Sequence, residues 1–287
     1  MKSTTRIGLA ACIALAALTP ASANHSWGGY HWANGTSRTL VVKRALSSTN
    51  WTNLVNAAMA DWQGKPLSFA ISNAPTSTSR RNCTPVAGTT LVCNDTYGQR
   101  GWLGIASIWA NGTHITQATT KLNDTYFNMS RYNNDSWRRM VACQEVGHNW
   151  GLAHQDETFG NYNLGSCMDY TNAPTGGTLN GFNYGPSNVR PNATDYNHLT
   201  SFYNHADASA AATTNFGQRQ VGKPTAAGGP PAGFNEALSD NSAEWGAAIH
   251  RDGRGRPDVF LKDFGNSHKR LVHVFWALEA KGHESQH

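Results

Sequence analysis

Residues 143–154 decide the fold and the chemistry of this chain, and they read Cys-Gln-Glu-Val-Gly-His-Asn-Trp-Gly-Leu-Ala-His. Gln144 and His148 are four residues apart, so on a helix they project from one face, with Glu145 beside them. Gly151 permits the sharp turn that His154 needs in order to return to the same point. Two imidazoles on either side of a glycine turn, next to a carboxylate, suit a catalytic zinc ion, which takes neutral nitrogen ligands and keeps one position open for water.

These letters resemble the metzincin metallopeptidases, whose motif is H-E-x-x-H-x-x-G-x-x-H followed by a methionine turn. Glu145, His148, Gly151 and His154 match four of the five fixed letters. Downstream, residues 166–170 read Ser-Cys-Met-Asp-Tyr and look like the methionine turn. The resemblance covers roughly residues 40–205, but its specific letters lie only between 144 and 170.

The resemblance implies a zinc cofactor and the hydrolysis of peptide bonds in protein or peptide substrates. His148 and His154 would be metal ligands, and Glu145 would accept the proton of the attacking water. By the same resemblance, Met168 would form an apolar floor beneath the metal. Tyr170 would lie near the zinc and donate a hydrogen bond to the oxyanion.

Gln144 departs from the motif, because the metzincins have histidine at this position. Three interpretations are open. Gln144 could coordinate zinc through its amide oxygen, a neutral but weaker ligand than imidazole. A group elsewhere could supply the third contact, with Asp156 and Tyr170 the nearest candidates. The site could also be degenerate, in which case the protein is a catalytically inactive, secreted binding protein with a peptidase-like fold.

The N-terminal residues predict export. Lys2 and Arg6 precede an apolar run at positions 7–18, and Ala-Ser-Ala at 21–23 is typical of a cleavage site. Residues 1–23 are therefore predicted to be a signal peptide. An apolar run of about a dozen residues is too short for a bilayer, which requires roughly 20, and no longer run follows. We expect a secreted, extracellular protein without a membrane span.

Four cysteines remain outside the predicted signal peptide, and in an exported chain four cysteines favour two disulfides. Cys83 and Cys93 are ten residues apart, with proline and glycine between them, as in a local loop. Cys143 and Cys167 would then pair by elimination, although the sequence alone allows three connectivities. This second bridge also agrees with the metzincin resemblance, in which the elements that carry the two cysteines face each other.

The predicted fold is α+β, a zincin- or metzincin-like domain with a twisted mixed sheet, an active-site helix and a methionine turn. Residues 24–205 are predicted to form this domain, 206–240 a flexible linker, and 241–287 a small C-terminal segment with a β-hairpin. Helical spacing and cap residues predict helices over 51–62, from the cap cluster 133–136 to Gly151, and over 193–203. Strand patterns lie at 40–42, 67–71, 103–109, 114–122, 259–261 and 271–278.

The rest of the chain offers fewer functional signals. By resemblance, strand 103–109 would be the sheet edge along which an extended substrate pairs, with an ordinary edge strand as the alternative. The formal charge of +5 is spread without a long basic run, which argues against nucleic-acid binding. We expect a monomer, and no chemistry is recognisable in the C-terminal hairpin. Surface or structural roles are expected for the histidines without partners at ligand spacing, such as His25, His31, His114 and His198.

Overall fold

The computed structural model describes residues 25–33, 39–64, 66–205, 207 and 229–279. The predicted signal peptide lies outside these residues, as does most of the predicted linker. Among the helices within these ranges, none is long and apolar enough to cross a membrane.

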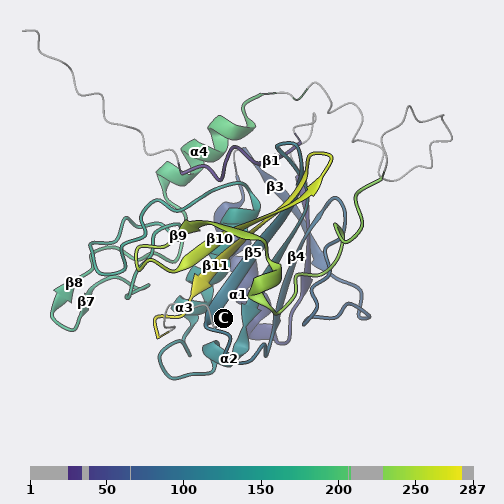
Figure 1. Cartoon of the computed structure of the whole chain (residues 1–287). Coiled ribbons are helices and arrows are strands. Elements are labelled where there is room, and N and C mark those ends of the chain that lie inside the picture. Colours follow the sequence, from purple (N-terminus) through teal and green to yellow (C-terminus); the bar gives the residue numbers. More distant parts are fainter. Residues whose placement is uncertain (1–24, 34–38, 65, 206, 208–228, 280–287) are drawn as a thin grey trace, which may run out of the picture.

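The architecture is α+β and centres on one mixed sheet (Figure 1). Within the described ranges nine strands share this sheet, in the order β3-β2-β4-β6-β5-β11-β10-β9, with β1 beside β6. The pairs among β1, β2, β3, β4 and β6 are parallel, whereas the pairs that involve β5, β9, β10 and β11 are antiparallel. The strands of the sheet are β1 (His31–Trp32), β2 (Thr39–Ala45), β3 (Ser68–Asn73), β4 (Thr89–Asp95), β5 (Trp102–Asn111), β6 (His114–Asn123), β9 (Ala247–Arg251), β10 (Pro257–Gly265) and β11 (His268–Trp276). A separate short pair consists of β7 (Thr178–Leu179) and β8 (Phe182–Asn183).

Capping side chains begin the helices, and the three predicted helices are confirmed. The side chain of Ser48 accepts a hydrogen bond from the amide of Trp51, and that of Asn134 accepts one from the amide of Trp137. These contacts satisfy backbone donors that the start of a helix leaves without partners. The helices are α1 (Thr49–Trp62), α2 (Asp124–Phe127), α3 (Asp135–Asn149) and α4 (Ala193–Tyr203).

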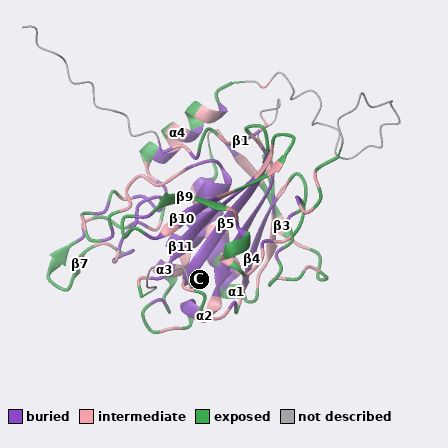
Figure 2. Cartoon of the chain, in the orientation of Figure 1, coloured by how far each residue is buried: buried purple, intermediate pink, exposed green. Residues whose placement is uncertain are grey.

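The main core lies between the sheet and two of these helices. Helix α3 packs on β5, β6 and β11, and α1 packs beside α3. The opposite face of β5 and β11 is covered by the chain around Leu238 and Trp245, which pack against Trp102, Val272 and Val274. The central strands are therefore buried on both faces, as Figure 2 shows by their colour.

The C-terminal strands complete the main sheet. Strands β10 and β11 pair in antiparallel fashion, and β11 then pairs with β5 from His268 opposite Asn111 to Trp276 opposite Trp102. The prediction that strand 103–109 is a sheet edge is therefore wrong, because β6 and β11 occupy both sides of β5. The physical reason is that residues 271–276 are buried on both faces, and such a strand is most stable inside a sheet.

Both predicted disulfides are present. One joins Cys83 to Cys93 of β4, and the other joins Cys143 of α3 to Cys167. The second bridge holds the segment that carries Met168 against the helix that carries Glu145. Disulfides persist in oxidising compartments, so the two bridges are consistent with an extracellular location.

Candidate metal centre

A glycine turn brings the two histidines of the motif together. Gly151 follows α3 with a φ of +98°, a conformation that residues with a Cβ rarely adopt. A Cβ at this position would lie 2.0 Å from the carbonyl oxygen of Tyr30, so the close backbone contact also requires glycine. The chain turns here and returns His154 to His148, with their ring centroids 4.8 Å apart.

Hydrogen bonds determine which nitrogen each of these histidines can offer to a metal. His148 Nδ1 lies 2.7 Å from the carbonyl oxygen of Leu152, which can only accept, so Nδ1 carries the proton. His154 Nδ1 lies 2.9 Å from Oε1 of Glu157 and can donate to it in the same way. In both rings Nε2 is buried and has no hydrogen-bond partner. Metal-bound imidazoles usually have this arrangement, with the outer N–H on a carbonyl or carboxylate.

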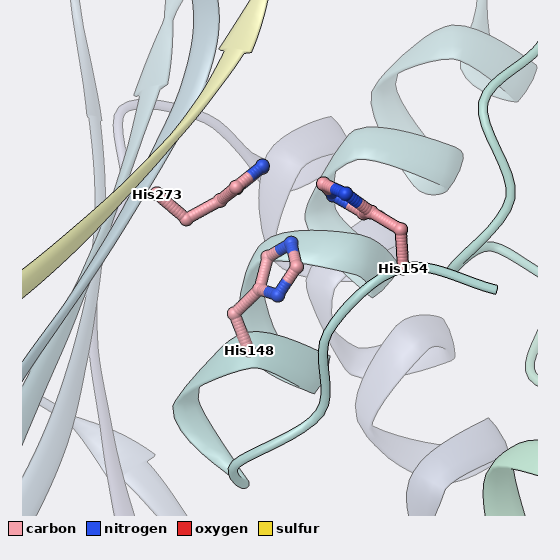
Figure 3. A group of neighbouring side chains, drawn as sticks. All are labelled: His148, His154 and His273. Atoms are coloured by element: carbon pink, nitrogen blue, oxygen red, sulfur yellow. The ribbon is translucent and has the colours of Figure 1, made fainter. Parts of the chain in front are cut away.

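A third imidazole comes from β11. His273 pairs with Ala106 of β5 and points toward α3. Its ring centroid lies 3.8 Å from that of His148 and 4.5 Å from that of His154. One nitrogen of each ring lies within 4.8 Å of the others, and Figure 3 shows the three side chains directed to a common centre. His148, His154 and His273 can therefore hold a metal ion together.

Glu145 and Tyr170 lie on either side of His273. Oε2 of Glu145 is 3.3 Å from Nδ1 of His273, and the Tyr170 hydroxyl is 3.1 Å from Nε2 of the same ring. Both residues are buried, and burial is the main cause that raises the pKa of Glu145 and of Tyr170 well above their usual values. The carboxylate can therefore take up a proton more readily than an exposed glutamate does, and the phenol retains its own.

Gln144 occupies the motif position of the missing histidine and is fully buried. Its Nε2 donates to the carbonyl oxygen of Cys167 at 2.8 Å. This bond sets the orientation of the amide and leaves Oε1 buried without a hydrogen-bond partner. The amide oxygen is therefore a candidate ligand in addition to the three imidazoles.

The methionine of the Ser-Cys-Met-Asp-Tyr segment packs against the helix. Met168 is fully buried, and a Cβ added at Gly147 would lie 2.5 Å from its Sδ. Gly147 immediately precedes His148 in α3. The thioether thus lies directly under the helical turn that carries His148, and only glycine at position 147 leaves room for it.

The donor set fits zinc, for which imidazole is a common ligand. Burial, followed by the neighbouring imidazoles, lowers the pKa of His148 and of His273 well below the usual value, so both rings are neutral at pH 7. Buried polar atoms normally have partners. A cation and a water molecule at this centre would supply the missing partners of Nε2 of His148, Nε2 of His154, Oε1 of Gln144 and Oε1 of Glu145.

Residues of the C-terminal strands also contact Glu157, the hydrogen-bond partner of His154. Glu157, which accepts from His154, lies 3.7 Å from Nε2 of His250 in β9. Nδ1 of the same His250 is 2.8 Å from the buried Asp258 of β10. The hydrogen bond to Glu157, supported by these ion pairs, holds the imidazole of His154 in one orientation and one tautomer.

His273 was not among the site residues predicted from the sequence. Residues 271–276 read Leu-Val-His-Val-Phe-Trp, so His273 lies within an apolar run. This pattern could have indicated a functional histidine, because a polar ring that is buried with such a strand needs a partner. Asp156, one of the predicted alternatives for the third contact, does not join the three histidines. Its two carboxylate oxygens accept hydrogen bonds from Thr158 and Asn161.

The chain was compared with protein-family models, curated protein sequences and solved structures. No family model matches the chain, and no curated protein sequence matches it. Among solved structures, it is similar to high choriolytic enzyme 1, a hatching enzyme zinc-protease from Oryzias latipes (Medaka fish), with 13% sequence identity and a TM-score of 0.34. The match covers 61% of this chain and 94% of that chain. A superposition this loose does not establish a shared activity, so the side chains of the centre carry the functional assignment.

Proposed function

We propose that this protein is a secreted zinc-dependent endopeptidase, in which His148, His154 and His273 hold the metal and Glu145 is the general base. The observation that carries the proposal is the convergence of three imidazoles beside a buried carboxylate. Zinc, when bound, would polarise a carbonyl group and lower the pKa of a water molecule. The reaction is the hydrolysis of peptide bonds in proteins or peptides.

The contacts of Glu145 and Tyr170 suit the roles of proton carrier and oxyanion donor. Glu145 keeps Oε2 on His273 and has Oε1 without a hydrogen-bond partner, so Oε1 can accept a proton. Because burial raises the pKa of this carboxyl group, it can retain that proton until the leaving amine takes it. The Tyr170 hydroxyl can donate to the negative oxygen that develops on the carbonyl group. Gly151 and Met168 have structural roles, in turning the chain and packing under α3.

A second candidate is a catalytically inactive, secreted zinc protein that binds a peptide or a surface partner. The burial of the centre favours it, since Glu145, His148 and His273 are each at most 1% exposed. Strand β11 also covers the side of β5 along which a peptide could add as a strand. In this conformation a peptide bond reaches Glu145 only if part of the surrounding chain moves.

Zinc content and casein hydrolysis, measured on the same preparation, separate the two functions. Hydrolysis is expected to stop when a chelator removes zinc and to return when zinc is added back. Glu145→Gln is expected to lower the rate by about 100-fold or more, the usual size of a general-base contribution. Zinc content should stay unchanged in this variant, because the amide oxygen can still accept from His273.

A matched control is Glu236→Gln, which removes the charge of an exposed glutamate and should leave the rate unchanged. Zinc bound by the wild type without any hydrolysis would support the inactive binding protein instead. A folded protein that retains no zinc at neutral pH would refute the metal centre and both candidate functions with it.

A further inference from the structure

A second histidine cluster surrounds Asp207, which follows α4. The Nε2 atoms of His31, His114 and His205 lie 3.6, 3.3 and 3.0 Å from one oxygen, Oδ1 of Asp207. The ring centroids of His114 and His205 are each 5.0 Å from that of His31. These residues share no ligand spacing along the chain, which is why the sequence predicted only surface or structural roles for His31 and His114.

Backbone contacts bring the three segments of this cluster together. His31 of β1 is the parallel register partner of His114 at the start of β6. The hydroxyl of Tyr203, the last residue of α4, accepts a hydrogen bond from the amide of Trp32 at 3.2 Å. The end of α4 is thereby held against β1, and the two remaining residues of the cluster follow directly after it.

The hydrogen bond of His31 directs an unpartnered nitrogen toward Asp207. Its Nδ1 lies 2.8 Å from the carbonyl oxygen of Gly29, so in the neutral ring Nδ1 carries the proton. Nε2 then presents a lone pair to the negatively charged carboxylate of Asp207, which is repulsive. This Nε2 is buried without a hydrogen-bond partner, in a residue that is 7% exposed. A cation between these two atoms would remove the conflict, because it can accept the lone pair of Nε2 and neutralise the carboxylate.

The three nitrogen-to-oxygen distances are compatible with a zinc site. With ligand bonds of about 2.0–2.2 Å, the edges of the tetrahedron are about 3.3–3.6 Å long. The three nitrogen-to-oxygen separations lie within a few tenths of an ångström of this range. The ligand atoms of His31, His205 and Asp207 all lie within 4.8 Å of one another, whereas His114 lies outside this group and contacts it through Asp207. Three imidazoles with one carboxylate favour zinc over calcium or magnesium, which prefer oxygen ligands.

We propose that His31, His205 and Asp207, with His114 as the fourth ligand, form a second zinc site, independent of the peptidase proposal. With His114 as the fourth ligand, this site would be structural and would leave no open position for a substrate. It would fasten the chain after α4 to β1 and β6.

The second site would also stabilise the surroundings of the first centre. The segment that contains β1 packs along the glycine turn, since the Tyr30 carbonyl oxygen lies against Gly151 and the His25 carbonyl oxygen accepts from the amide of Ala153 at 2.6 Å. Ala153 directly precedes the ligand His154. A zinc ion that anchors this segment would therefore limit the motion of the loop that carries His154.

Zinc stoichiometry of the full mature chain tests the second site. The metal-free protein is titrated with zinc alone, and bound zinc is counted by calorimetry and by elemental analysis. Asp207→Asn, which removes the charge with little change of shape, is expected to bind one equivalent less than the wild type. His205→Ala is expected to lose the same equivalent, and because the side chain of His205 is 48% exposed, its removal should not disturb the core. The rise in melting temperature on zinc addition should be smaller in both variants.

The matched control is His268→Ala, which removes a histidine at the hairpin turn and should bind as much zinc as the wild type. The measured quantity is the difference in bound zinc between the wild type and each variant. The expected difference is one equivalent, whether or not the first centre binds zinc. If Asp207→Asn and His205→Ala both bind as much zinc as the wild type, the second site is refuted and the cluster is a network of ion pairs only.

Discussion

Replacement of His273 by asparagine would show whether the C-terminal strand supplies a metal ligand. The asparagine amide can still donate to Glu145, as Nδ1 does at 3.3 Å, but the side chain loses the Nε2 atom beside Tyr170. The binding free energy of structural zinc is about 10–16 kcal/mol at pH 7, which corresponds to roughly 3 kcal/mol for each of four ligands. The Kd for zinc is therefore expected to rise by about 100-fold. The unpartnered Tyr170 hydroxyl should cost about 1–3 kcal/mol of stability, which a folded domain can tolerate.

The assay is a competition titration against a chelator of known zinc affinity at pH 7, with circular dichroism to verify the fold. An Asp207→Asn background restricts the titration to the first centre. His268→Asn, at the other end of the same strand, is the matched control, because its ring contacts the carbonyl oxygen of Asn266 and the ring of Phe234 and is not one of the three clustered imidazoles. Unchanged zinc affinity in a folded His273→Asn variant would refute the assignment of His273 as a ligand.

Three further substitutions test the centre and the sheet beside it. Gln144→His is expected to tighten zinc binding about tenfold or more in the same titration, because imidazole is the stronger ligand; unchanged affinity would place this side chain away from the metal. Gly151→Ala is expected to lower the free energy of unfolding in urea by roughly 3 kcal/mol, because the added Cβ would lie 2.0 Å from the Tyr30 oxygen at a φ of +98°. An effect no larger than that of Gly160→Ala, where no atom lies within 4 Å of the added Cβ, would contradict this reasoning. Burial lowers the pKa of Lys121 from 10.5 to about 8 in the folded state. Between these values the unfolded chain binds more protons, so stability should rise with pH, by about 2 kcal/mol from pH 7 to 9.5. Lys121→Met should remove this rise in urea unfolding, and an equal rise in the variant would assign it to another group.

Local patterns in the sequence predicted helices α1, α3 and α4 and two of the proposed metal ligands. Ser48 and Asn134 start their helices through contacts that reach only three residues along the chain. The convergence of His148 and His154 likewise depends on one helical turn and on the conformation of Gly151. All of this lies within a dozen residues, so spacing and residue type were enough to predict it. Strand β4 was not predicted, because its short apolar run takes its conformation from its neighbours β2 and β6.

Only the tertiary structure decided which residue supplies the third imidazole. His273 lies 128 residues from Glu145 along the chain, and their contact depends on the pairing of β11 with β5 in one register. A shift by a single residue would turn His273 to the opposite face of the sheet, yet no local pattern encodes that register. The cluster around Asp207 has the same origin, since it needs β1, β6 and the end of α4 to meet. The sequence by itself therefore determined the pairing of His148 with His154, and long-range contacts determined the rest of the first centre and the whole cluster around Asp207.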